Sequence, residues 1–600
     1  MKYSFFTSKE IKPSGWLRRQ LEIQAKGLSG NLDKVWPDVR DSAWIGGESE
    51  SWERVPYWLD GFIPLAYLLE DEDMIARAKR YIDAIIATQR EDGWICPCAD
   101  EEREKYDNWA VQLFTKTLTV YYECSGDERI PDVVYRVLRN YYELLKAEKI
   151  HLFSWGKYRW FEAFVAIRFI YEKYPEEWLL ELAKILKEQG VDYEDMTELW
   201  KRPLNKWTFD THIVNLTMML KEEAVTADFL GTEYTDKAER LREVLKKHNG
   251  TPVEIFTGDE CLSGLSPIQG TELCSVVEQM YSYEWLYAYT GDRKWAERLE
   301  VLAFNALPAA ISDDMWTHQY DQMSNQIACV AFPGRSLFRT NRPDANRFGL
   351  EPHYGCCTAN FNQGWPKLTL STFMRDGDGI VSVLPIPSVL TLPDVKIELV
   401  GDYPFKNGYE YKIEAKREFN FKARIPSFAK GLTVNGVPHE GDIDVSIGVG
   451  TSAIKIAFDV EAELAKRPHE LYTFKRGSLV FSLPIKYEKV MYEYEKAGVE
   501  RKFPYCDYEY LPKSDWNYAY AADNATVCEE EVDAIPFSSE NPPLTLSASA
   551  VKINWGLEDG FELVCSKLPE ERIALGDVEA VKLIPYGCAK LRMTEIPLIK

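Results

Sequence analysis

The residue types best suited to chemistry lie in two short segments that are far apart in the sequence. Cys356 and Cys357 are adjacent, and Glu272 and Cys274 are two residues apart in Gly-Thr-Glu-Leu-Cys. Adjacent cysteines seldom bond to each other, because the small ring strains the disulfide. In extended backbone, Glu272 and Cys274 share one face. The four side chains are the ligands that tetrahedral zinc takes. The alternatives are small buried thiols and a carboxylate at a helix start.

A second candidate site consists of two adjacent carboxylates. Asp259 and Glu260 lie in the glycine-flanked segment 258–264, just before Glu272. A carboxyl group in a pocket can act as a general acid on a leaving oxygen if its pKa is raised. The alternative is an acidic turn in solvent. The sequence leaves open which of the two carboxylates would face a pocket.

Aromatic and polar residues alternate in two further segments, 44–61 and 316–322. Aromatic rings can stack on the C–H face of a sugar, while carboxylates and amides accept its hydroxyls. The alternative is that these rings pack the core, and that a lone histidine is structural. The candidate sugar-binding residues are Trp52, Trp109, Trp155, His212, His318 and Gln322.

A helical framework is expected to hold these residues. Up to about residue 375 the apolar residues follow a helical spacing, which predicts about twelve helices. Paired helices suit an (α/α)6 toroid, although a solenoid has the same periodicity. The predicted ranges are 14–30, 53–70, 73–89, 107–124, 131–148, 155–174, 177–189, 207–225, 234–248, 271–289, 293–308 and 357–374.

After residue 375 the pattern alternates with period two, which predicts short strands in β-sandwich, jelly-roll-like domains. The segment 434–437, Val-Asn-Gly-Val, is typical of a hairpin turn. All but two of the 18 tryptophans precede this change, so the functional cavity is expected in the helical part. We therefore expect a catalytic domain at 1–375 and β-sandwich regions at 376–490 and 491–600.

The composition narrows the classes of partner. The 71 Lys and Arg against 95 Asp and Glu give a net charge of −24, which disfavours nucleic acid and anionic membranes as partners. No segment has the length of apolar residues that a membrane helix needs, and the N-terminus lacks a secretory pattern. We expect a cytoplasmic protein with reduced cysteines, acting on a small oligosaccharide or glycoside, and a possible homodimer.

Taken together, these motifs resemble glycoside hydrolase family 127, the β-L-arabinofuranosidase type, and its neighbour family 146. The resemblance runs the length of the chain. The motifs that carry it lie at 15–21, 56–61, 270–274, 356–360 and 583–592.

The resemblance implies an (α/α)6 barrel followed by β-sandwiches, with Zn²⁺ on Glu272, Cys274, Cys356 and Cys357. It implies Cys356 as the nucleophile and Glu260 as the general acid/base of a retaining exo-glycosidase. The substrates would be terminal β-L-arabinofuranosides of plant-derived oligosaccharides. Two other functions stay open: a different (α/α)6-barrel enzyme, such as a uronide hydrolase or sugar epimerase, and a non-catalytic glycan-binding protein.

Overall fold

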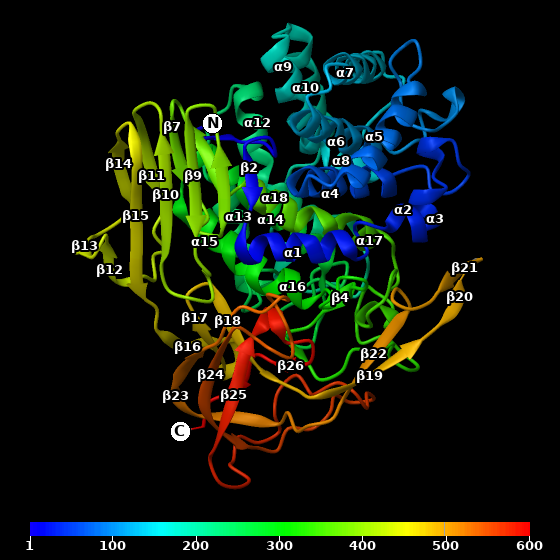
Figure 1. Ribbon diagram of the computed structural model, residues 1–600. Coiled ribbons are helices and arrows are strands. Elements are labelled where there is room, and N and C mark those ends of the chain that lie inside the picture. The colour runs from blue at the N-terminus through cyan, green and yellow to red at the C-terminus, as the bar shows by residue number, and fades with distance from the viewer. Residues whose placement is uncertain (497, 600) are drawn as a thin grey trace.

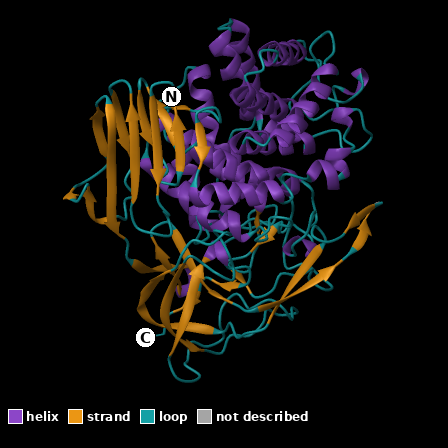
Figure 2. Ribbon diagram, viewed as in Figure 1, coloured by secondary structure: helices purple, strands orange, loops and turns teal. Residues whose placement is uncertain are grey.

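The structure is a computed structural model that describes residues 1–496 and 498–599. A helical part and a β-rich part make up the molecule (Figures 1 and 2). The helices are α1 (Gly15–Lys26), α2 (Leu32–Val35), α3 (Pro37–Arg40), α4 (Arg54–Leu69), α5 (Glu72–Ala87), α6 (Trp109–Ser125), α7 (Ile130–Lys146), α8 (Ser154–Tyr158), α9 (Ala163–Lys173), α10 (Glu177–Gln189), α11 (Ile213–Met218), α12 (Glu222–Leu230), α13 (Lys237–Asn249), α14 (Leu273–Thr290), α15 (Arg293–Val301), α16 (Leu307–Ala309), α17 (Cys356–Asn360) and α18 (Gly364–Leu370).

The long helices are arranged in two layers. In the inner layer α4 contacts α6, α6 contacts α9, α9 contacts α12, α12 contacts α14, α14 contacts α18, and α18 contacts α4. These contacts close a ring. Helices α4, α6 and α14 are buried on almost every side, as expected of helices with no face in solvent. Helices such as α5 and α7 bury only one face and lie outside this ring.

The predicted helical segments are present, but four of them are interrupted. The segment 155–174 divides into α8 and α9, and 207–225 divides into α11 and α12 around a 3₁₀ turn. The segment 293–308 passes through a π-helical turn at Leu302–Ala306. The predicted helix 357–374 is broken by a 3₁₀ turn at Phe361–Gln363 and ends at Leu370. Hydrophobic spacing persists through such breaks, so periodicity alone could not locate them.

The inner ring encloses fully buried ion pairs. Lys116 Nζ lies 3.3 Å from Asp60 Oδ2 and 3.4 Å from Glu162 Oε2, and all three side chains have no exposed surface. Lys367 Nζ donates to the same Asp60 oxygen at 2.6 Å. Glu162 also pairs with Lys221. Removing one cation from this network leaves its carboxylates with less compensating positive charge, in a medium that solvates them poorly.

Substituting Lys116→Met is therefore expected to destabilise the protein by about 3–5 kcal/mol. Equilibrium unfolding in urea, followed by tryptophan fluorescence, measures this change. The control is Lys79→Met, which removes a solvent-exposed pair with Asp83 and is expected to cost less than about 1 kcal/mol. Equal losses for the two variants would contradict the stabilising role of the buried pairs.

The β-rich part contains most of the strands. They are β1 (Ser4–Phe5), β2 (Ile11–Pro13), β3 (Thr271–Glu272), β4 (Asp321–Gln322), β5 (Asn325–Gln326), β6 (Phe373–Asp376), β7 (Gly379–Ser382), β8 (Ser388–Thr391), β9 (Val395–Val400), β10 (Tyr409–Ala415), β11 (Phe419–Ala423), β12 (Lys430–Val434), β13 (Val437–Pro438), β14 (Ile443–Ile447), β15 (Gly450–Asp459), β16 (Ala462–Arg467), β17 (Leu471–Arg476), β18 (Leu479–Pro484), β19 (Tyr487–Tyr492), β20 (Tyr494–Lys496), β21 (Val499–Arg501), β22 (Asp507–Pro512), β23 (Tyr518–Glu529), β24 (Leu544–Lys552), β25 (Glu579–Pro585), β26 (Arg592–Met593) and β27 (Ile596–Pro597).

The strands form three larger sheets. Two of them, β1-β6-β7-β11-β14 and β13-β12-β15-β10-β9-β8-β2, use the chain from β6 to β15 together with the two N-terminal strands. The third is built on β16-β17-β18-β25-β24-β23. Between β12 and β13, Asn435 and Gly436 both have positive φ angles, so the predicted hairpin turn is present.

The division into domains at residues 375 and 490 stays a prediction, and the sheets add two observations to it. Strands β1 and β2 pair with β6 and β8, so the start of the chain joins the β-rich part. Residue 490 lies inside β19, whereas the larger sheets change between β15 and β16. Among the residues that the structure describes, no helix is long and apolar enough to cross a membrane.

Candidate active site

The two cysteine-containing segments converge at one end of the helical ring. Strand β3 pairs with β4, which places Glu272 opposite Asp321, and α14 begins directly after Glu272 and carries Cys274 in its first turn. Cys356 and Cys357 begin α17, which contacts both α4 and α14. One ligand atom from each of Glu272, Cys274, Cys356 and Cys357 lies within 4.8 Å of the others. The predicted juxtaposition of the two segments is present.

The chemistry of this cluster fits a divalent cation. Burial raises the pKa of Glu272, of Cys274 and of Cys357 well above their usual values. Hydrogen bonds from the Cys274 and Cys357 thiols lower the pKa of Cys356 well below its usual range. Glu272 is 1% exposed, and its Oε2 accepts no hydrogen bond from the residues that the structure describes. Three thiols and one buried carboxylate are a donor set that suits zinc.

Glu260 lies beside this cluster and is held by three side chains. Its Oε1 accepts a hydrogen bond from Tyr320 Oη at 2.6 Å. Its Oε2 accepts one from Trp207 Nε1 at 3.0 Å and lies 3.1 Å from His212 Nε2. Tyr320 Oη also lies 3.1 Å from Cys356 Sγ and 3.1 Å from Glu272 Oε1. A single hydroxyl group therefore contacts the carboxylate, the thiol and the candidate metal ligand.

The neighbouring carboxylate, Asp259, points away from the cavity into the loop. It is fully buried and accepts hydrogen bonds from Gly270 N at 2.7 Å, Ser263 Oγ at 2.8 Å and Arg339 N at 2.9 Å. Burial raises the pKa of Asp259 to about 6, against these donors. Asp259 thus fixes the loop that carries Glu260, and of the two adjacent carboxylates only Glu260 lines the cavity.

A cavity of about 280 Å³ opens onto the thiol cluster, which is space for one sugar ring. Of the predicted sugar-binding residues, Trp52, Trp155 and His212 line it. Trp155 packs edge-on against His212, with ring centroids 4.9 Å apart. The full lining is Trp52, Glu53, Arg54, Tyr57, Trp155, Arg159, Trp207, His212, Val214, Glu260, Glu272, Cys274, Tyr320, Tyr354 and Cys356.

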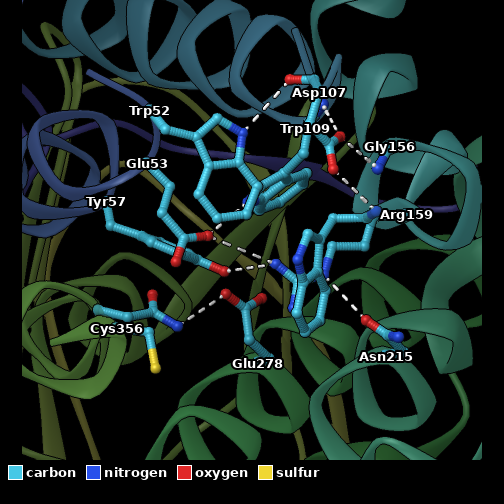
Figure 3. A network of polar contacts seen from close by, with 12 residues as sticks. Trp52, Glu53, Tyr57, Asp107, Trp109, Gly156, Arg159, Asn215, Glu278 and Cys356 are labelled. Carbon is cyan, nitrogen blue, oxygen red and sulfur yellow. Dashed lines mark hydrogen bonds and ion pairs between the residues drawn. The ribbon is translucent and has the colours of Figure 1, made fainter. Parts of the chain in front are cut away.

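One wall of the cavity is an ordered polar network around Arg159 (Figure 3). Arg159 donates from Nη1 to Tyr57 Oη at 3.2 Å and from Nε to Asn215 Oδ1 at 2.9 Å. Its guanidinium carbon lies 4.4 Å from the Trp155 ring centroid. Arg159 Nη1 is also 3.8 Å from Glu53 Oε2. Burial raises the pKa of Glu53, and the charges of Arg54 and Arg159 oppose that shift.

The other three predicted sugar-binding residues do not line the cavity. Trp109 is fully buried behind it and donates from Nε1 to Glu53 Oε2 at 2.8 Å. His318 Nε2 lies 3.1 Å from Thr358 Oγ1, and burial lowers the pKa of His318 to about 4. Gln322 donates to Ala306 O at 2.8 Å and accepts from Tyr586. In each case the polar atoms are used by neighbouring protein groups.

Three residues of the site were not singled out by the sequence. Trp207 donates to Glu260, Arg159 organises the polar network of Figure 3, and Tyr320 contacts both the carboxylate and the thiol. Tyr320 lay within the aromatic segment 316–322, which is the one signal that pointed toward it. Trp207 and Arg159 belong to no local motif, and their role depends on packing between segments distant in sequence.

Comparison with known proteins agrees with this geometry. Residues 45–369, more than half of the chain, match the family model for the GH127 catalytic domain of β-L-arabinofuranosidase. A search of curated protein sequences finds no match. A GH127 β-L-arabinofuranosidase from Geobacillus stearothermophilus T6 superposes with a TM-score of 0.68 at 14% identity, covering 98% of this chain and 100% of that one.

Two further solved structures share the fold. One described as a glycoside hydrolase has a TM-score of 0.68 at 13% identity, and a GH127 β-arabinofuranosidase has 0.67 at 12% identity. Each comparison covers 100% of this chain and 98% of the other. At these identities the superpositions show a common fold, while the family model covers the segments that carry Glu260 and both halves of the thiol cluster. The chain belongs to the GH127 β-L-arabinofuranosidase family and is a glycoside hydrolase.

Proposed function

We propose that this protein is a retaining, zinc-dependent exo-glycosidase that releases terminal β-L-arabinofuranosyl groups through a cysteine nucleophile. One observation carries the proposal. Tyr320 Oη lies 2.6 Å from Glu260 Oε1 and 3.1 Å from Cys356 Sγ, so a carboxylate and a thiol flank the same point of the cavity. This proximity is compatible with the about 5–5.5 Å that separates the two reacting groups of retaining glycosidases.

The fold we propose for the helical part is an (α/α)6 toroid, with jelly-roll-like β-sandwiches after it. The closed ring of contacts from α4 through α18 and back to α4 supports this arrangement. Helices α1, α5, α7, α10, α13 and α15 pack outside the ring and supply the second layer. The β-rich part supports the sandwich assignment because its strands alternate buried and exposed residues, as in β10.

The residues that would hold the ion are Glu272, Cys274, Cys356 and Cys357. Bound zinc supplies the positive charge that keeps thiolates ionised at neutral pH. In the protein itself, Arg54 contributes a positive charge that lowers the pKa of Cys356, after the two thiol hydrogen bonds. Cys356 is the partly exposed member of the cluster and lines the cavity, whereas Cys357 is fully buried and does not. This difference supports Cys356 as the nucleophile.

The reaction follows from the positions of two groups. The Cys356 thiolate attacks the anomeric carbon, a C–S bond forms, and the glycosidic C–O bond breaks. Glu260 gives its proton to the departing oxygen. Water then attacks the same carbon, the C–S bond breaks, and Glu260 takes the proton from that water. Two displacements at one carbon retain its configuration.

The cavity suits a single terminal sugar. Trp52, Trp155 and Trp207 provide aromatic faces for the apolar side of the ring. Glu53 and Arg159 also line the cavity and carry acceptors and donors for hydroxyl groups. A cavity of about 280 Å³ has room for one ring, which supports removal of terminal residues rather than cleavage within a chain.

A panel of chromogenic glycosides tests this proposal. It contains α- and β-linked pentofuranosides and pentopyranosides and an unsaturated uronide, each assayed with and without a chelator. We expect fastest release from the β-L-arabinofuranoside and loss of that activity on chelation, with about one zinc per chain by elemental analysis. Preference for the uronide, or full activity without metal, would support a different enzyme on the same fold.

Tyr320→Phe tests the contact that joins the two reacting groups. Removing the hydroxyl takes away its contacts with both Glu260 and Cys356, and a single proton donated to a charged group contributes about 1.5–3 kcal/mol. We therefore expect kcat to fall by about 10- to 100-fold with little change in KM. Steady-state kinetics on the preferred aryl glycoside measures both. A change in KM alone would show that Tyr320 only contacts the sugar.

A further inference from the structure

We propose that the cavity holds a second divalent-cation site, formed by His212, Glu260 and Glu272, which fills at excess metal and inhibits the enzyme. His212 Nε2 lies 3.1 Å from Glu260 Oε2 and 3.9 Å from Glu272 Oε2. One donor atom from each of the three residues lies within 4.8 Å of the others. Imidazole nitrogen and carboxylate oxygens are zinc ligands. Because Glu272 is shared with the thiol cluster, this inference rests on the proposed function.

The carboxylate of Glu272 is oriented to serve two ions. Its Oε1 faces the thiol cluster, 3.9 Å from Cys357 Sγ and 3.1 Å from Tyr320 Oη. Its Oε2 faces His212 and accepts no hydrogen bond from the described residues, although the side chain is 1% exposed. A buried carboxylate oxygen without a partner is costly. Carboxylates that offer one oxygen to each of two cations are a feature of two-metal sites.

The charges around the three residues also favour a cation. His212, Glu260 and Glu272 are all buried, and two of them are carboxylates. The guanidinium groups on the cavity wall are used elsewhere, since Arg54 and Arg159 both pair with Glu53. The only positively charged partner within ion-pair distance of Glu260 or Glu272, among the described residues, is His212 in its protonated form.

The second site is expected to bind more weakly than the thiol cluster. A metal-bound histidine usually donates its other ring N–H to an acceptor, but His212 Nδ1 has no partner among the described residues. Glu260 Oε2 also accepts from Trp207. The second site therefore fills only after the thiol cluster has bound its ion. An ion there occupies the Glu260 lone pair that the proton transfers require, and it shares the cavity with the sugar, so inhibition is competitive with substrate.

Calorimetric titration of Zn²⁺ into full-length protein that already holds one ion per chain tests the inference. We expect one further ion per chain, and competitive inhibition by the same Zn²⁺ concentrations in the aryl glycoside assay. Cobalt added instead of zinc should bind without a thiolate-to-cobalt charge-transfer band, because the donors are nitrogen and oxygen. Mg²⁺ should not compete, because it requires a nearly complete oxygen octahedron.

Two variants and one control test whether His212 and Glu260 hold the second ion. His212→Ala and Glu260→Gln should each weaken the second ion by at least about tenfold while leaving the first in place. His151→Ala, which removes an exposed histidine, should bind both ions. The inference is overturned if His212→Ala still binds the second ion with parental affinity, or if the added cobalt shows a thiolate band. A protein that retains no first ion would instead contradict the proposed function.

Discussion

Cys356→Ser is expected to lower kcat on a β-L-arabinofuranoside by about 10⁴-fold or more, the order that loss of a covalent nucleophile costs in other hydrolases. A serine hydroxyl in this position is far less ionised than a thiol whose pKa the neighbouring Cys274 and Cys357 thiols lower. Steady-state kinetics on an aryl glycoside measures the loss. Activity within tenfold of the parent enzyme would remove Cys356 from the reaction.

Two controls separate this result from a loss of structure or metal. Cys124→Ser replaces another buried thiol, on α6, and should keep full activity. Because Cys356 is also a proposed metal ligand, zinc content is measured on the same preparation. A variant that retains zinc but does not turn over assigns the loss to the nucleophile.

Glu260→Gln is expected to lower kcat/KM on glycosides with poor leaving groups by about 10²–10⁴-fold. An amide cannot give a proton to the departing oxygen, although its single oxygen can still accept from either Tyr320 or Trp207. Leaving groups that need no protonation, such as a dinitrophenolate, should be released in the first step with a much smaller loss of rate. Kinetics over a series of aryl glycosides of different leaving-group pKa measures this dependence.

The matched control is Asp259→Asn, one residue away. Asp259 accepts from Gly270, Ser263 and Arg339 and does not line the cavity. Its substitution should lower stability and should change activity equally for all leaving groups. If kcat/KM depends more steeply on leaving-group pKa in Asp259→Asn than in Glu260→Gln, the assignment of the acid/base to Glu260 is wrong.

The candidate metal ligands could be predicted to lie together because their chemistry is explicit in the sequence. Adjacent cysteines and a Glu-x-Cys motif are rare combinations whose donor types suit zinc, and the resemblance to family 127 joined the two segments. The structure places these four donors together through the pairing of β3 with β4 and the start of α17 beside α4 and α14. What could not be predicted from residue types was that Asp259 turns into its loop while Glu260 faces the cavity.

The residues that line the cavity were harder to predict because aromatic and amide side chains also pack in the core. His318 forms a hydrogen bond with Thr358, and Gln322 donates one to Ala306, so neither side chain faces a ligand. Trp109 supports Glu53 from behind the cavity. Conversely, Arg159 and Trp207 acquire their roles only when segments distant in sequence pack together. Local patterns do not contain such contacts.

In the fold, too, features that depend on local sequence could be predicted, whereas features that depend on distant partners could not. Helical periodicity located the long helices of both layers because a buried stripe repeats along each one. The breaks at Leu302–Ala306 and Phe361–Gln363 keep that spacing, so periodicity did not locate them; only Gly364 and Pro366, just after the second, indicate an interruption. Strands β1 and β2 are two and three residues long, too short to show alternation, and their position depends on partners more than 350 residues away.

In the proposed mechanism the sulfur of Cys356 forms a covalent bond to the sugar. Glu260→Gln should accumulate this thioglycoside with an activated aryl β-L-arabinofuranoside, because release of the sugar by water still requires the base. Acid quenching followed by peptide mass spectrometry detects the adduct directly. We expect one anhydropentose on the peptide that contains Cys356 and Cys357, with fragmentation assigning it to Cys356. A sugar attached to Glu272 or another carboxylate, or no adduct during a measured burst of aglycone, would contradict it.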